Sequence, residues 1–98
     1  MWVGWLRVDL LLGDVHSLKQ KRSVVRPVVA EVRRRFDVSV AEVDHVDQHR
    51  RTTIGVAVTS TDPAHVGDVL DHVERLVANR PEVELLDVQR RVLRHDDV

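Results

Sequence analysis

Residues 2–12, WVGWLRVDLLL, alternate between two kinds of side chain. The even positions are all apolar or small, whereas the odd positions include Arg7 and Asp9. An alternation with period two is typical of a β-strand with one buried face. The chain is therefore predicted to begin with a strand whose even positions face the core.

A helix is predicted shortly after this strand, with Ser17 as its N-cap. Apolar residues then recur at helical spacing: Leu18, Val25, Val28 or Val29, Val32 and Phe36. Pro27 interrupts the pattern, because it has no N–H for the carbonyl of Ser23, which costs about 3 kcal/mol inside a helix. Two arrangements stay open: one helix with a kink over 23–26, or a short turn over 17–24 and a second helix that begins at Pro27.

A hairpin is predicted next. Residues 37–46 alternate imperfectly, which indicates a strand with a bulge near Ala41 and Glu42. A polar loop over 47–51 then joins this strand to another over 52–60, where the even positions are β-branched and the odd ones small.

A second helix and a last strand complete the chain. Asp62 followed by Pro63 predicts the helix start, with aspartate as the cap and proline as the first helical residue. Residues 79–81 end that helix, a strand is expected over 83–93, and residues 94–98 are expected to form a frayed tail.

The predicted order is strand, helix, strand, strand, helix, strand. Right-handed crossovers place both helices on one face of a four-stranded antiparallel sheet, an α+β arrangement written βαββαβ. The 98 residues suit one domain, expected over 1–93 with the tail at 94–98. A core of this size is only marginally sufficient, so pairing with a second copy would add stability.

Composition excludes several kinds of chemistry. The chain has no cysteine, which excludes disulfides, a thiolate nucleophile and cysteine-ligated metal centres. No signal-peptide pattern and no apolar run long enough to span a bilayer is present, so a cytoplasmic protein without a membrane partner is expected.

Charge is unevenly distributed along a chain whose formal net charge is −1. Residues 16–35 carry seven bases against one acid, whereas residues 62–79 carry four acids against one base. The folded protein is therefore predicted to be electrically polarised.

Three segments resemble a known family. Residues 17–25, SLKQKRSVV, resemble the SLKxKRSVV opening of the first helix in YlxP-like proteins, the domain of unknown function 503. Residues 40–44, VAEVD, with Asp47, and residues 54–58, IGVAV, are similar to the second and third strands of that family. The resemblance covers nearly the whole chain from Met1 to about Leu93. Departures from the family pattern occur at Pro27, His49 and Arg50.

The resemblance implies a ferredoxin-like fold and no established activity. Such proteins are commonly encoded among bacterial genes for transcription elongation, translation initiation and ribosome maturation. The resemblance therefore implies RNA or the ribosome as a partner.

The basic face of the first helix is the candidate binding site. Lys19, Arg22 and Arg26 lie at positions i, i+3 and i+7, so their charges share one side of the helix and suit a phosphate backbone. With the loop bases added, the predicted RNA-binding residues are Lys19, Lys21, Arg22, Arg26, Arg50 and Arg51. Stacking of bases is not expected, because the strand over 52–60 has no aromatic residue. The alternative is a solvated helix face that only keeps the protein soluble.

An apolar patch is predicted on the sheet face opposite the helices. Val3, Trp5 and Leu11 share that face of the first strand, with Gly55 and Ala57 beside them. Exposed apolar patches usually mark an interface, so homodimerisation through sheet faces or edges is predicted. The alternative is local packing by the last strand.

The hairpin contains Asp44, His45, Asp47 and His49, which are metal-ligand types without a recognised ligand spacing. A polar turn is expected there, with a metal site as the alternative. Neither a catalytic partner for the histidines nor a glycine-rich phosphate loop is evident. The prediction is a non-enzymatic module for RNA or a ribosome-associated partner, with no metal or small-molecule cofactor. The alternative is a homodimeric structural or regulatory domain that binds protein and no nucleic acid.

Overall fold

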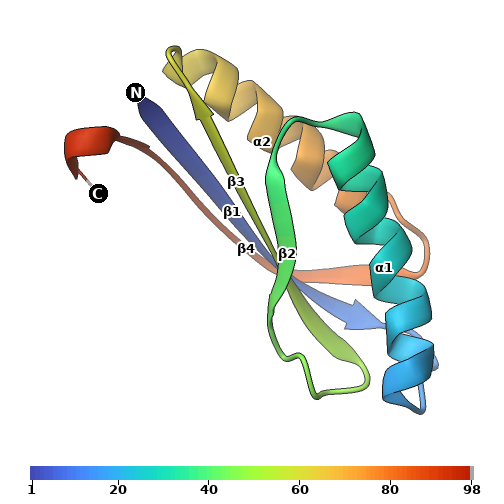
Figure 1. Cartoon of the computed structure of the whole chain (residues 1–98). Coiled ribbons are helices and arrows are strands. Elements are labelled where there is room, and N and C mark those ends of the chain that lie inside the picture. Colours follow the sequence, from blue (N-terminus) through green and yellow to red (C-terminus); the bar gives the residue numbers. More distant parts are fainter. Residues whose placement is uncertain (98) are drawn as a thin grey trace.

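Four antiparallel strands form one sheet, and both helices cover the same face of it in the computed structural model (Figure 1). The structure describes residues 1–97. The elements in chain order are β1 (Trp2–Leu12), α1 (Leu18–Arg35), β2 (Ser39–Asp44), β3 (Arg51–Ser60), α2 (Pro63–Ala78), β4 (Val83–Arg94) and a short 3-10 helix (His95–Asp97). The strand order is β2-β3-β1-β4, so β2 and β4 are the sheet edges. The predicted βαββαβ order is confirmed.

The core lies between the sheet and the helices. Every even position of β1 from Gly4 to Leu12 is buried, as the period-two pattern predicts. α2 packs across β1, β3 and β4, while α1 packs chiefly along β2. Gly4 allows α2 to approach closely, because a Cβ there would lie 2.2 Å from Cγ1 of Val66.

Both helices begin where the sequence predicts. The Ser17 hydroxyl accepts a hydrogen bond from the Gln20 N–H at 3.1 Å, and the Asp62 carboxylate accepts one from the Ala64 N–H at 2.9 Å. Pro27 lies inside one continuous helix, so the alternative with a second helix that begins at Pro27 is wrong. Burial of the apolar face of α1 against the sheet outweighs the cost of one proline.

Two strand irregularities and the C-terminal end differ from the predictions. The β2 bulge falls between Glu42 and Asp44, slightly later than predicted, and β4 has an unpredicted irregularity opposite the Asp9/Leu10 step. Arg94 belongs to β4, and the His95 N–H donates to the Met1 carbonyl at 2.9 Å. Residues 95–97 form the short 3-10 helix, the fraying of the tail stays a prediction, and residue 98 lies outside the described residues.

Candidate nucleic-acid interface

Three basic side chains form an exposed row on the outer side of α1. Lys19, Arg22 and Arg26 are all exposed. With Ser23 and Pro27 they line a shallow hollow of about 400 Å³. Within residues 1–97 no acidic side chain forms an ion pair with any of the three. We call Lys19, Arg22 and Arg26 the α1 ridge.

Lys21 does not belong to this exposed surface, which corrects the sequence prediction. Its side chain is only 3% exposed, and its Nζ lies 2.9 Å from Oε2 of Glu42 on β2. The ammonium also donates to the carbonyls of His45, at 2.5 Å, and Val46, at 3.0 Å. All three donors of the ammonium therefore have partners.

These contacts make Lys21 a clamp between α1 and the β2-β3 hairpin. The hairpin turns sharply at His45, whose φ is 56°, a left-handed conformation that is uncommon for a residue other than glycine. The Lys21 ammonium holds the carbonyls that follow this turn. Lys21, the second lysine of the SLKQKRSVV segment, thus stabilises the fold. The sequence contains a signal for this, because Lys21 is in phase with the buried residues Val25, Val28 and Val32.

The two predicted loop bases also lie apart from the α1 ridge. The Arg50 Nε donates to the Gly13 carbonyl at 2.9 Å, so this exposed arginine anchors the turn that precedes α1. Arg51 pairs with Leu11 in the β1-β3 ladder, which places its side chain on the open face of the sheet. Its Nε is buried without a hydrogen-bond partner among the described residues. Only Lys19, Arg22 and Arg26 of the six predicted residues form one surface.

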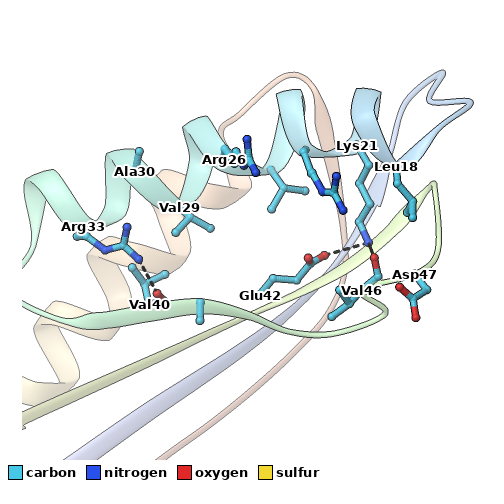
Figure 2. A pocket seen from close by; sticks show the side chains of 13 residues that line it. Leu18, Lys21, Arg26, Val29, Ala30, Arg33, Val40, Glu42, Val46 and Asp47 are labelled. Atoms are coloured by element: carbon cyan, nitrogen blue, oxygen red, sulfur yellow. Dashed lines mark hydrogen bonds and ion pairs between the residues drawn. The ribbon is translucent and has the colours of Figure 1, made fainter.

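A groove of about 520 Å³ runs between α1 and edge strand β2 (Figure 2). Its walls include the aliphatic side chains of Leu18, Val25, Val29, Ala30, Val40 and Val46. At one end Arg33 donates to the Val40 carbonyl at 3.1 Å. Glu42 and Asp47 lie at the other end, beside Lys21, as Figure 2 shows. Arg22 and Arg26 also line the α1 wall, so the groove is basic along most of its length and its two acidic side chains lie toward one end.

The open face of the sheet is not one continuous apolar patch. Val3 and Trp5 are half-buried near one end, as predicted. Leu11 is separated from them by a polar belt, in which Arg7 pairs with Asp44 at 2.9 Å and the Thr53 hydroxyl donates to Asp9 at 2.5 Å. Val3, Trp5 and Leu11 therefore do not form the one apolar patch that the sequence predicts, and their use as an interface stays a prediction.

Asp44 is the residue whose protonation the fold clearly alters. The His45 N–H donates to its carboxylate at 2.7 Å, and this hydrogen bond is the main reason that the pKa of Asp44 lies below its ordinary value of 3.8. The charges of His45, Arg7 and Arg51 lower the pKa further, while partial desolvation opposes them. The carboxylate is thus held ionised beside Arg7.

The hairpin side chains do not gather into a metal site in the part of the chain that the structure describes. Asp44 faces Arg7, while His45 Nδ1 lies 3.1 Å from the Gln48 amide nitrogen. Among residues 1–97, no helix is both long and apolar enough to cross a bilayer.

The strand order and the two helices on one face define a ferredoxin-like α+β domain, here with an exposed basic ridge on its first helix. A de novo designed protein with a ferredoxin fold, solved by solution NMR, superposes with a TM-score of 0.51. It is 13% identical, and the match covers 97% of this chain and 88% of the designed one. This likeness supports the fold alone.

The chain belongs to the family described as Protein of unknown function (DUF503), whose model matches residues 3–90. The Uncharacterized protein YlxP of Bacillus subtilis (strain 168) is similar, with 29% identity over 82 residues. That match covers 84% of this chain and 89% of the relative. The resemblance seen in the sequence is confirmed, and it carries no assigned activity.

Proposed function

We propose that this chain is a non-catalytic RNA-binding module, for free or ribosomal RNA, and that the α1 ridge contacts the phosphate backbone. The observation that carries the proposal is a contrast between cations. Most basic side chains near the hairpin and the groove are occupied: Arg7 and Lys21 by acids, Arg33 and Arg50 by carbonyls. Lys19, Arg22 and Arg26 are exposed and have no such partner within residues 1–97.

The spacing of the α1 ridge suits a phosphate backbone. Lys19 and Arg26 are seven positions apart, which is about 10 Å along the helix axis. The three cations therefore lie in a row on one side of α1. Cations without acidic partners release counterions from RNA on binding without first losing an ion pair of their own. Paired cations such as Arg80, 2.7 Å from Glu31, would have to give up that partner.

Contacts of this kind recognise backbone and shape more than sequence. The ridge contains no aromatic side chain on which a base would stack, and the open face offers only Trp5 as a stacking surface. The RNA should therefore be structured, and affinity should fall steeply as salt rises. The proposal involves no cofactor and no catalytic step.

Binding of purified protein to ribosomal subunits and to structured RNA, followed by fluorescence anisotropy at low salt, tests the proposal. The test variant is Lys19→Ala/Arg22→Ala/Arg26→Ala. The control variant, Arg75→Ala/Arg91→Ala/Arg94→Ala, removes the same charge from exposed positions outside α1. We expect a loss of at least about tenfold in affinity for the test variant and about twofold or less for the control.

Equal losses in the two variants would mean that only net charge matters, and the α1 ridge would then be no site. No binding by the wild-type protein at low salt would overturn the proposal. The alternative function, a protein-interaction domain without nucleic-acid binding, would then be favoured by the groove along β2.

A further inference from the structure

The outer edge of β2 has hydrogen-bonding groups without a strand partner. β2 is the last strand of the sheet on the α1 side, and Arg33 donates to the Val40 carbonyl from outside the sheet. That contact favours a Val40 backbone that points away from β3. Backbone direction alternates along a strand, so Glu42 points outward as well.

The groove beside this edge has basic side chains along its α1 wall and a carboxylate of β2 toward one end. Arg33 occupies the end near Val40, and the carboxylate of Glu42 lies toward the opposite end, next to Lys21 (Figure 2). Oε2 of Glu42 forms an ion pair with Lys21 and accepts a hydrogen bond from the Thr52 hydroxyl. Its other oxygen has no hydrogen-bond partner among residues 1–97. Arg33 near one end and the free oxygen of Glu42 near the other are complementary to the same two groups of a copy that runs in the reverse direction.

We propose that β2 is a self-association edge, which pairs antiparallel with β2 of a second copy of this chain about a two-fold axis at Ala41. In this register Val40 lies opposite the partner's Glu42, and the reverse pair follows by symmetry. The two pairs exchange about four backbone hydrogen bonds and join the two sheets into one.

The same register unites the opposite charges. The partner's Glu42 projects from the helix-covered face of the sheet, beside Val40, where Arg33 now reaches the Val40 carbonyl. In the dimer, Arg33 leaves the Val40 carbonyl and pairs with the free carboxylate oxygen of the partner's Glu42. The Val40 carbonyl then accepts a hydrogen bond from the backbone N–H of the partner's Glu42. Each copy makes this exchange once, so both ends of the groove become occupied.

Ala41 makes the close approach at the two-fold axis feasible. It is exposed on the open face, and a methyl side chain leaves room for a pair whose Cα atoms lie about 4.5 Å apart. Self-association at β2 does not use the open-face residue Trp5, whereas Arg22 and Arg26 of the α1 ridge also line the groove beside β2.

Cysteine cross-linking tests the register directly, since the natural chain contains no cysteine. The Ala41→Cys variant should form a disulfide-linked dimer rapidly under mild oxidation, because the expected Cα separation falls within the range that a disulfide spans, roughly 4.4–6.8 Å. Glu84→Cys, exposed on edge strand β4, is the matched control and should link slowly. Equal linking of the two variants would overturn the proposal.

Sedimentation equilibrium of the cysteine-free protein supplies the second readout. Arg33→Glu should weaken self-association at least about tenfold, because two like charges then meet at each end of the groove, while Arg34→Glu should change it about twofold or less. A wild-type protein that stays monomeric up to about millimolar concentration would overturn the proposal. The free edge would then be left for a strand from a different protein.

Discussion

Replacing Lys21 with methionine tests whether this lysine is part of the fold or part of a binding surface. Methionine keeps the aliphatic length and removes the charge. The change leaves Glu42 without its cation and the carbonyls of His45 and Val46 without their donor. We expect a marked loss of stability with no direct effect on RNA affinity.

The structure sets the size of the effect. Removing one partner of a fully buried ion pair costs about 3–5 kcal/mol. The Glu42 side chain is 22% exposed and keeps the Thr52 hydroxyl, and water reaches the exposed Val46 in the hairpin. These features lower the expected loss in the free energy of unfolding to about 2–3 kcal/mol.

Urea unfolding followed by the fluorescence of Trp2 and Trp5 measures this loss. Lys19→Met, on the exposed side of the same helix, should change stability by no more than about 0.5 kcal/mol. The double variant Lys21→Met/Glu42→Gln keeps an acceptor for Thr52 and removes the unpaired charge. It should recover about 1 kcal/mol relative to Lys21→Met alone.

RNA affinity should respond in the opposite way. Folded Lys21→Met should bind as the wild type does, whereas Lys19→Met should bind more weakly. Equal stability of the two single variants would refute the clamp. A Lys21→Met protein of normal stability with reduced RNA affinity would return Lys21 to the binding surface.

Three further changes test particular contacts. Gly4→Ala places a Cβ 2.2 Å from Cγ1 of Val66 on α2 and should lower the free energy of unfolding by about 1–3 kcal/mol. Gly13→Ala, whose Cβ would have no atom within 4 Å, should leave it unchanged, and equal urea midpoints for the two variants would contradict this expectation. Pro27→Ala returns a hydrogen-bond donor to α1 and should raise stability by about 1–3 kcal/mol, so an unchanged or lower midpoint would count against it. The lowered pKa of Asp44 means that its stabilising contribution is present at neutral pH and is lost as pH falls through 3.8 toward the lower folded value, so Asp44→Asn should flatten the stability profile below about pH 4.

Periodicity predicted the elements of this fold because each element has one buried face. β1 alternates strictly, and α1 and α2 carry apolar stripes that end at clear caps. The same periodicity also indicates which bases are hidden. Lys21 shares the phase of Val25 and Val28, and Arg51 has the open-face parity of Thr53. Proximity in the sequence to the exposed bases does not distinguish these two residues, whereas their phase does.

Long-range pairing accounts for what the sequence did not reveal. Arg7 and Asp44 are 37 residues apart, and nothing in either segment indicates that they meet across the sheet. That ion pair divides the open face, so the predicted patch around Trp5 does not extend to Leu11. The groove along β2 also depends on how α1 packs against an edge strand, which periodicity alone does not specify.

The salt dependence of RNA binding tests the α1 ridge most directly. Each phosphate contact contributes about 0.7–0.9 to the slope of the logarithm of affinity against the logarithm of salt concentration. Removing Lys19, Arg22 and Arg26 together should therefore reduce the magnitude of this slope by about 2–3. The variant that lacks Arg75, Arg91 and Arg94 should keep the wild-type slope. Equal slopes in the wild type and the ridge variant would show that the ridge does not contact phosphates, and would contradict the central claim.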